Sequence, residues 1–303
     1  MQPKPIPVDV LCVGHASFDM VFSIPKHPLS DEKMSASNFQ QSGGGPAANA
    51  SLLISKLGLR SAFAGYLGLD AYGEQHLAEF KKNHVNCTLL IQGQNPTPIT
   101  TILVKPNGQR ALINFKGETQ ALPVNAINFE RIRPRVILVD GHEPHISLPL
   151  IQKAKDYNIP TVLDAGSLHE GTEKLMPVVD HLVCSQKFAR QFAQTEQQAF
   201  TLLSKIAPNL IITLGEQGLL WKTPEQTGQL SAFPITAIDT TGAGDAFHGA
   251  FAAGLSQQMP WPALLRYASA AGAYCCMHIG ARQGLPSKEQ LKKFQTQKKN
   301  VLI

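Results

Sequence analysis

The sequence predicts an α/β fold: a doubly wound, mostly parallel sheet with helices on both faces. First, 303 residues with 43% hydrophobic and 16% charged content suffice for one large domain with a sizeable core. Second, short apolar runs alternate with helical segments along most of the chain. Third, glycine-rich loops open helices near 42–49 and 239–245, as they do where α/β sheets bind ligands. We expect residues 1–303 to form a single domain.

Short apolar runs mark the expected strands, because a buried strand needs about four to eight such residues. These runs cover 8–14, 60–67, 99–104, 110–115, 136–139, 161–164, 181–184, 210–214 and 233–238. The turn Pro106-Asn-Gly108 predicts a β-hairpin, and 218–221 predicts another. The polar, strand-like stretch 20–41 is expected to join 99–115 in a small sheet beside the main one.

Helices are expected between these strands, where apolar or small residues recur. They cover 50–57, 70–83, 148–157, 172–178, 188–207, 261–279 and the segment opened by 242–245. In an open α/β sheet, ligands bind at the carboxyl ends of the strands. The stretches expected at those ends are 15–19, 140–145, 164–167, Ser185, Gly215 and 242–245. We therefore expect them to meet in one site.

The segment 239–245, Asp-Thr-Thr-Gly-Ala-Gly-Asp, carries the strongest chemical signal. Gly242, Ala243 and Gly244 let the backbone turn and aim its N–H groups at one point, where a helix dipole adds positive potential. Asp245 in the first turn indicates a base that accepts a proton from a hydroxyl while the amides hold negative charge. The alternative is an ordinary glycine-rich turn with a capping aspartate.

Composition and motifs exclude several classes. A net charge of +5 without a basic, aromatic-rich stripe argues against nucleic-acid partners, and the absence of a run of about 18 uncharged apolar residues argues against a membrane span. Five cysteines without metal spacing, and an N-terminus unlike a signal peptide, predict a cytoplasmic protein. No Gly-Lys pair forms a Walker A loop, and Phe247 replaces the third glycine of a dinucleotide fingerprint.

Two further stretches fit a sugar and a nucleotide. Asp19 and Asn49 offer a carboxylate and an amide of the kind that bind sugar hydroxyls. The segment 213–218 ends a strand with two glycines, which permits close backbone approach to a nucleotide. Each also has a plain structural interpretation: a turn residue, a helix-start amide and a hairpin.

Together these stretches resemble the ribokinase (pfkB) family of carbohydrate kinases over residues 8–287. Gly44-Gly45-Pro46-Ala47-Ala48-Asn49 with Gly58 is similar to the N-terminal signature of the family. The segment 239–250 is similar to its C-terminal signature, and Thr213-Leu-Gly215 with Gly218 to its nucleotide-side segment. The resemblance implies a ribokinase-like fold in which about 20–41 and 97–118 form a β-sheet lid over the sugar.

The resemblance also implies transfer of the ATP γ-phosphate to a sugar hydroxyl, with Mg²⁺ accompanying ATP and Asp245 as the base. The amides from Gly242 to Asp245 would hold charge on the transferred phosphate. The implied sugar-binding residues are Asp19, Gly44, Gly45 and Asn49, and the implied ATP-binding residues are Ser185, Thr213, Gly215, Gly218, Ala271 and Gly272. In relatives that use a monovalent cation, Asp239 and Thr241 belong to its site, which makes K⁺ a candidate cofactor. A homodimer through the lid is the candidate assembly.

One departure concerns Mg²⁺. The family often has Asn-x-x-Glu where this chain has Ser185 and Phe188, so no protein ligand for Mg²⁺ is assigned. The chain is similar here to the ketohexokinase and sulfofructose kinase branches. The run 43–48 and the segment 110–114, Arg-Ala-Leu-Ile-Asn, most resemble the sulfofructose kinase branch.

The expected acceptor is a furanose-form ketohexose, or a relative with an anionic end such as sulfofructose, phosphorylated on a primary hydroxyl. Lys33 in the lid segment, Arg110 and Asn114 on the facing strand, and His142 after a main-sheet strand are the candidate contacts. Lys33 and Arg110 are alternatively solvated, or Arg110 reaches the ATP phosphates. His142 stands where the sulfofructose branch usually has arginine, so a neutral ketose remains an alternative.

Two rival functions follow from the same fold. A nucleoside kinase would need apolar or aromatic lid residues to stack a base, whereas the lid candidates between 33 and 40 are mainly polar. A non-catalytic sensor would have lost the base or the glycines, and both are intact. A metal site at His142-Glu-Pro-His145 lacks a third ligand in the sequence, which favours a loop at the sugar pocket.

Overall fold

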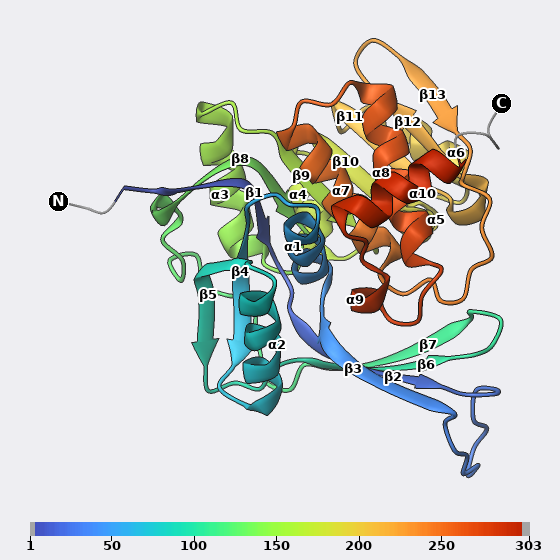
Figure 1. The fold of residues 1–303 in the computed structure, drawn as a ribbon. Coiled ribbons are helices and arrows are strands. Elements are labelled where there is room, and N and C mark those ends of the chain that lie inside the picture. Colours follow the sequence, from blue (N-terminus) through green and yellow to red (C-terminus); the bar gives the residue numbers. More distant parts are fainter. Residues whose placement is uncertain (1–3, 299–303) are drawn as a thin grey trace.

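The computed structural model describes residues 4–298, so residues 1–3 and 299–303 of the predicted domain lie outside it. Its main strands are β1 (Ile6–Val13), β4 (Ser61–Gly68), β5 (Asn86–Gly93), β8 (Ile132–Val139), β9 (Thr161–Ala165), β10 (His181–Ser185), β11 (Asn209–Thr213), β12 (Leu219–Lys222) and β13 (Thr227–Leu230). Within the described range they form a nine-stranded sheet in the order β13-β12-β11-β10-β9-β8-β1-β4-β5 (Figure 1). All neighbouring strands are parallel except β11–β12 and β12–β13, which are antiparallel. The predicted, mostly parallel sheet is therefore confirmed.

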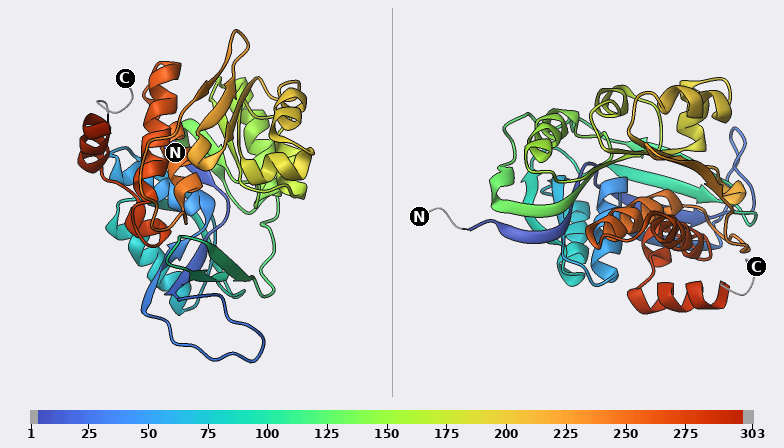
Figure 2. Two further views of the ribbon diagram at one scale, coloured as in Figure 1. Left: turned by 90° about the vertical axis from the view of Figure 1, so that its right-hand side faces the viewer. Right: turned by 90° about the horizontal axis from the view of Figure 1, so that it is seen from above.

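Helices cover both faces of this sheet (Figure 2). One layer contains α1 (Pro46–Lys56), α2 (Ala71–Lys82), α7 (Ala243–Ser256), α8 (Trp261–Cys275) and α10 (Lys288–Lys298). The other contains α3 (Pro144–Asp156), α4 (Glu170–Leu175), α5 (Gln186–Phe192) and α6 (Glu196–Leu203). In β1, Val10 and Cys12 enter the first core and Leu11 and Val13 the second, the pattern of a strand buried on both faces.

A second sheet, the lid sheet, projects from the main one (Figures 1 and 2). Its strands are β2 (Ser17–Ser23), β3 (Asn38–Gly44), β6 (Ile99–Val104) and β7 (Arg110–Phe115), in the order β3-β2-β6-β7. The predicted hairpin is confirmed, and Gly108 in its turn has a φ of 75°. The sheet begins at Ser17 and continues to Gly44, beyond the predicted 20–41, because β2 and β3 pair along their full length.

The lid sheet is anchored to the C-terminal part of the chain. Val21, Ile102 and Val104 are buried around Ile279. At the hairpin turn, a Cβ on Gly108 would lie 3.3 Å from the carbonyl oxygen of Ile238. The lid sheet therefore packs against the segment that precedes α7 and the segment that follows α8.

Three predicted elements differ from the structure. Residues 233–238 form no strand, because the N–H of Ile238 donates to the carbonyl of Cys276 rather than to a neighbouring strand. The expected helix over 188–207 is divided in two, since Thr195 accepts a hydrogen bond from Gln198 and starts α6. The last long helix, α8, ends at Cys275 rather than Ile279.

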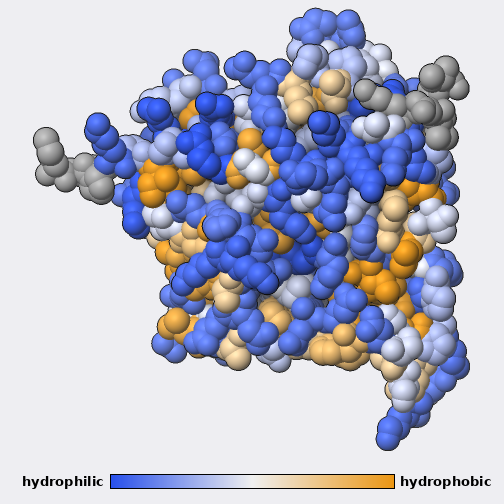
Figure 3. All heavy atoms as spheres, viewed as in Figure 1, coloured by the Kyte–Doolittle hydropathy of each residue, from blue (hydrophilic) through white to orange (hydrophobic). Residues whose placement is uncertain are grey.

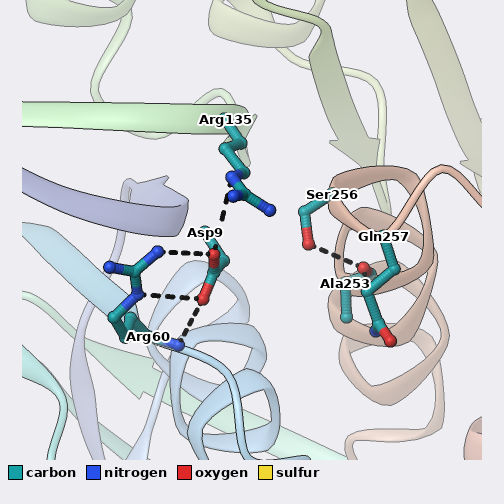
Figure 4. Close-up of polar contacts among 6 residues, drawn as sticks. All are labelled: Asp9, Arg60, Arg135, Ala253, Ser256 and Gln257. Carbon is teal, nitrogen blue, oxygen red and sulfur yellow. Dashed lines mark hydrogen bonds and ion pairs between the residues drawn. The ribbon is translucent and has the colours of Figure 1, made fainter.

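An ion-pair cluster ties three main strands together at the edge opposite the loops discussed below (Figure 4). Asp9 on β1 accepts hydrogen bonds from the backbone N–H, Nε and Nη2 of Arg60, at 2.8, 3.3 and 3.0 Å. Arg135 on β8 approaches the same carboxylate at 3.8 Å. The hydrogen bonds from Arg60 lower the pKa of Asp9. Figure 4 also shows Ser256 donating to Ala253 in the last turn of α7.

Within the described residues, no helix is both long and apolar enough to span a bilayer.

Candidate active site

A cavity of about 390 Å³ lies at the carboxyl ends of the parallel strands. The sheet order reverses at β1 and β8, which is where α/β sheets bind ligands. The predicted strand-end stretches supply much of the wall: Asp140, His142, Asp164, Gly166, Ser167, Ser185, Thr213, Gly215, Gly242, Gly244 and Asp245. Arg110 of the lid sheet closes one side. The expectation that these distant stretches meet is thus supported by the fold.

The turn before α7 takes its shape from Gly242. This residue caps the helix with φ 77° and ψ 0°, a left-handed conformation that favours glycine. A Cβ there would lie 2.5 Å from the Cβ of Ala281. Gly244 is helical instead, and a Cβ there would meet nothing nearer than His248 at 3.9 Å. The N–H of Ala243 donates to the carbonyl of Thr240 at 3.3 Å. Because first-turn N–H groups lack partners within the helix, the amides of Gly242, Gly244 and Asp245 can bind an anion at the cavity wall.

Asp239 stabilises the turn at Gly242 through buried hydrogen bonds. It is fully buried, and its Oδ1 accepts hydrogen bonds from the N–H and Oγ1 of Thr241 at 2.9 and 2.7 Å. Its Oδ2 accepts from the N–H of Gly280 at 2.8 Å. Within residues 4–298, no lysine, arginine or histidine forms an ion pair with Asp239.

Asp245 is held from the side by Asn49. The Nδ2 of Asn49 donates to Oδ2 of Asp245 at 2.6 Å, joining α1 to α7 across 196 residues of sequence. Asn49 is itself buried. It lies one turn into α1, which follows Gly45 at φ 97°. A Cβ on Gly45 would lie 2.4 Å from the carbonyl of His15, so glycine lets this helix start against the loop that follows β1.

Asp19 faces the same region from the lid sheet. Ser17 donates to its Oδ1 at 2.9 Å, and burial raises the pKa of Asp19 to about 6, with the negative charge of Asp245 adding to the shift. A Cβ on Gly44 would lie 2.2 Å from the carboxyl group of Asp19. Gly44 is therefore the residue that leaves room for this carboxyl group. Of the predicted sugar residues, Asn49 therefore contacts Asp245 and Asp19 lies close enough to be affected by its charge. Gly44 packs against Asp19 and Gly45 against His15.

Asp140 organises the loops at the sheet reversal. Its carboxylate accepts hydrogen bonds from the N–H groups of His15, Ala47 and His142 at 2.8, 3.1 and 3.0 Å. The ring of His142 lies between those of His15 and His169, with centroids 5.1 and 4.9 Å away. Burial lowers the pKa of His15 to about 3 and also lowers that of His169.

The histidines do not form a metal site. Within the described residues, no group of three or more His, Cys, Asp or Glu side chains is arranged to hold a metal ion. His142 instead lines the cavity together with His169. The interpretation of 142–145 as a pocket loop holds for His142, whereas His145 is exposed on α3, which begins at Pro144.

Asp164 and His248 form a buried pair that the sequence did not single out as a pair. Asp164 Oδ2 lies 3.1 Å from Nδ1 of His248, which also faces the carbonyl of Gly244 at 2.6 Å. Burial raises the pKa of Asp164 well above its usual value, and the charges of Asp245 and Asp140 act in the same direction. His248 follows Asp245 by almost one helical turn, a spacing that could have placed it at the site.

Three of the predicted nucleotide-binding residues line the cavity, and the other three lie outside its lining. Ser185, Thr213 and Gly215 line the cavity, and Ser185 caps α5 by accepting from the N–H of Phe188 at 3.0 Å. Phe188 is fully buried, so the position at which the family often has glutamate holds a hydrophobic core residue in this chain. The other three lie behind the wall: Gly218, where a Cβ would overlap the Leu230 carbonyl, and Ala271 and Gly272, which are buried on α8.

The candidate acceptor residues of the lid are more dispersed. Arg110 lines the cavity that Thr240 and Gly242 also line. The register aligns Asn114 with Thr100 and thus with Asp19 on one face of the lid sheet, although Asn114 is exposed. Lys33 is exposed in the loop between β2 and β3, outside the cavity wall.

Sequence reasoning missed Arg282, on the short helix α9 (Ala281–Gly284). Its Nε donates to Oδ1 of Asn49 at 2.6 Å. Only a charged residue in a glycine-rich, otherwise uncharged stretch hints at this role, because the partners lie 233 residues apart.

Comparison with known proteins agrees with this architecture. The model of a family described as "pfkB family carbohydrate kinase" matches residues 8–288. A ribokinase of Bacillus subtilis is 25% identical over 290 residues, covering 94% of this chain and 99% of the relative. A probable fructokinase-5 of Arabidopsis thaliana is 27% identical over 295 residues, covering 87% and 91%.

Solved structures share the fold. A putative ribokinase from Agrobacterium tumefaciens superposes with a TM-score of 0.86 at 25% identity, covering 96% of this chain and 98% of that one. Arabidopsis thaliana ribokinase, solved with ribose and ATP, has a TM-score of 0.81 at 24% identity and covers 95% and 99%. A Methanocaldococcus jannaschii nucleoside kinase has a TM-score of 0.77 at 19% identity and covers 97% and 100%.

Proposed function

The chain belongs to the pfkB family of carbohydrate kinases, and on that premise we propose that it transfers the γ-phosphate of ATP to a primary hydroxyl of a ketohexose or a related sugar. One observation carries the proposal. The carboxylate of Asp245 is held by Asn49 beside the N–H groups of Gly242 and Gly244, which have no hydrogen-bond partner among the described residues. This places a base and an anion site side by side, as phosphoryl transfer to an alcohol requires.

The reaction follows from these groups. Asn49 occupies Oδ2 of Asp245, which leaves Oδ1 to accept the proton of the acceptor hydroxyl. The alcohol oxygen bonds to the γ-phosphorus while the bond to the β-phosphate oxygen breaks, and ADP leaves with that electron pair. The amides of 242–245 hold charge on the transferred oxygens, and Asp19 orients the sugar from the lid sheet.

Mg²⁺ would neutralise charge on the ATP phosphates during this step. Asp164 fits as its carboxylate contact, because Asp164 lines the cavity and its buried Oδ2 accepts no hydrogen bond, with Nδ1 of His248 at 3.1 Å as its one neighbouring cationic group among the described residues. One carboxylate with phosphate oxygens and water is a usual environment for Mg²⁺. Neither Phe188 nor Ser185 supplies a carboxylate here.

Asp239 and Thr241 are the residues that would hold K⁺. A fully buried carboxylate is costly unless it is neutralised or well hydrogen-bonded, and Asp239 has three donors but no ion pair among the described residues. A monovalent cation held by Asp239 and Thr241 would neutralise that charge directly behind the anion site. The five free thiols agree with a reducing compartment, and we place the reaction in the cytoplasm.

The acceptor we propose is a ketohexose, with an anionic end such as a sulfonate as the preferred variant. Arg110 at the cavity wall and the His142–His169 pair supply cationic and hydrogen-bonding groups around the distal part of the site. Lys33 and Asn114 on the lid would complete the contacts when the acceptor is bound. The competing assignment is that Arg110 binds the ATP phosphates, which its place in the wall of the cavity that Gly242 also lines favours equally.

A substrate panel on the wild type and two lysine variants tests this assignment. We expect Lys33→Ala to lower kcat/KM for 6-deoxy-6-sulfofructose and fructose 6-phosphate more than for fructose, since a charge-assisted contact is lost. Lys205→Ala, an exposed lysine after α6, is the matched control and should leave all values unchanged. Equal behaviour of the two variants would show that the pocket does not use Lys33.

The same panel separates the rival functions. Activity with nucleosides alone would identify a nucleoside kinase of this fold, and binding of sugar and ATP without turnover would identify a sensor. The intact base and glycine turn favour catalysis over both.

We also propose a homodimer through the outer face of the lid sheet. The register places Phe39, Ile113 and Phe115 on one face, with exposures of 49, 64 and 58%. Hydrophobic residues are visible around the lid sheet at the lower right of Figure 3. Contiguous exposed apolar groups of this kind are typical of interaction sites.

Light scattering with size-exclusion chromatography tests the dimer. We expect the wild type to elute as a dimer and Ile113→Lys as a monomer, because a lysine would be desolvated in an apolar interface. Leu202→Lys, at a 40% exposed position on α6, is the matched control. A wild-type monomer at assay concentrations would contradict the proposal.

A further inference from the structure

We propose that Arg282 is a positioning residue for phosphoryl transfer, fixing the amide of Asn49 and through it the carboxylate of Asp245. This inference rests on the proposed role of Asp245 as the base. It assigns a function to a buried cation that lies in no signature motif of the sequence and lines no part of the cavity.

Arg282 is enclosed by partners on three sides. It is 4% exposed. Its Nε donates to Asn49 at 2.6 Å, Nη2 lies 2.8 Å from Nε2 of His76, and Nη1 lies 3.2 Å from Oε2 of Glu79. The guanidinium carbon is 5.4 Å from the centroid of the Phe80 ring. Burying a cation costs several kcal/mol unless it is paired, so the site depends on the guanidinium for its pairing with Asn49, His76 and Glu79.

The guanidinium fixes which way the Asn49 amide points. An arginine has donors only, so the atom of Asn49 that faces it must be the carbonyl oxygen Oδ1. The NH₂ group is then directed at Asp245, where it donates at 2.6 Å. If the amide turned over, its oxygen would face the carboxylate of Asp245 and the two acceptors would repel. Arg282 therefore decides whether the base is supported or displaced.

A second chain of contacts extends the network to the lid sheet. Glu79 on α2 pairs with Arg282, and its Oε2 also accepts a hydrogen bond from the N–H of Gly43 on β3 at 3.0 Å. A Cβ on Gly43 would lie 2.6 Å from the ring of His76. The strand that presents Gly44 to the sugar site is thereby joined to the group that positions the base.

The backbone places Arg282 against the anion site as well. Gly280 donates to Asp239 at 2.8 Å, and Ala281 packs against Gly242, where a Cβ would overlap its side chain. The backbone of Arg282 is thus fixed against the turn at Gly242, whose amides are the proposed phosphate-binding groups. The guanidinium can therefore hold Asn49 in one position, which a mobile surface cation could not do.

Steady-state kinetics of Arg282→Met test the proposal. Methionine keeps the length and apolar packing of the side chain but removes every donor. We expect kcat to fall by roughly 10- to 100-fold, the scale of a small misplacement of a catalytic group, with KM for ATP unchanged. Arg266→Met on α8 is the matched control, since Arg266 is exposed and should leave both constants unchanged.

A double-mutant cycle with Asn49→Ala separates positioning from general damage. If Arg282 acts through Asn49, Arg282→Met should cause no further loss of kcat in the Asn49→Ala background. An equal loss in both backgrounds would overturn the proposal, and so would a normal kcat in Arg282→Met. If the single variant does not fold, Arg282→Met/Glu79→Gln, which also neutralises the orphaned carboxylate, is measured in the same two backgrounds.

Comparison with Asp245→Asn separates the proposed positioning role of Arg282 from the proposed role of Asp245 as the base. A normal Arg282→Met beside an inactive Asp245→Asn would reject the positioning role alone. An active Asp245→Asn would reject the proposed base itself.

Discussion

Asp245→Asn is expected to lower kcat by roughly 10²–10⁴-fold, the range for removal of a positioned general base. The substituted amide is isosteric, and its oxygen can still accept the hydrogen bond from Asn49. Folding and ATP affinity should therefore be retained. Turnover is measured with the best acceptor, ATP binding by calorimetry, and stability by thermal unfolding.

The matched control for this substitution is Asp156→Asn. Asp156 ends α3 and is exposed, so the same chemical change there should leave turnover unaltered. Near-normal turnover of Asp245→Asn would remove Asp245 from the chemistry and require another base in the cavity.

Gly242→Ala is expected to lower kcat by about 10²–10³-fold, the effect of losing a donor from an anion hole. A Cβ cannot be accommodated at this position without movement, since it would lie 2.5 Å from the Cβ of Ala281. The left-handed conformation adds about 1–2 kcal/mol of strain for a residue with a side chain. The turn at Gly242 must shift, and its N–H groups would no longer point toward the position proposed for the transferred phosphate.

Gly58→Ala controls for backbone strain. Gly58 also has a positive φ, 82°, but a Cβ there would meet only Lys288 at 3.9 Å. Both variants should lose some stability, and only Gly242→Ala should lose activity. Equal kinetic effects, or a normal kcat for Gly242→Ala, would place the anion site elsewhere.

The parts of the fold that the sequence predicted were those with strong local patterns. Buried strands such as β1 and β10 are continuous apolar runs, and Pro106-Asn-Gly108 has the residues that a hairpin turn requires. Because parallel strands share one carboxyl edge, Asp140, Asp164 and Gly215 could be brought to one cavity before the sheet order was known.

The parts that could not be predicted depend on partners distant in sequence. Residues 233–238 have an apolar pattern suitable for a strand, but their hydrogen bonds go to the end of α8. Arg282 has no periodic pattern, and its role depends on Asn49, His76 and Glu79 from other helices. Phe188 appeared as a missing ligand, whereas its burial shows a packing role. Tertiary contacts, not local propensity, decided each case.

The separation of Asn49 and Arg282 by 233 residues has a consequence for protein synthesis. On the ribosome, β1 and β4 emerge early, but the other edge of β1 stays open until β8 is made. The guanidinium emerges only near the end of translation. A nascent chain that has already assembled its sheet therefore still lacks the contact that orients the Asn49 amide toward the proposed base. Premature termination after α8 would leave a protein with most of its fold and without this support for Asp245.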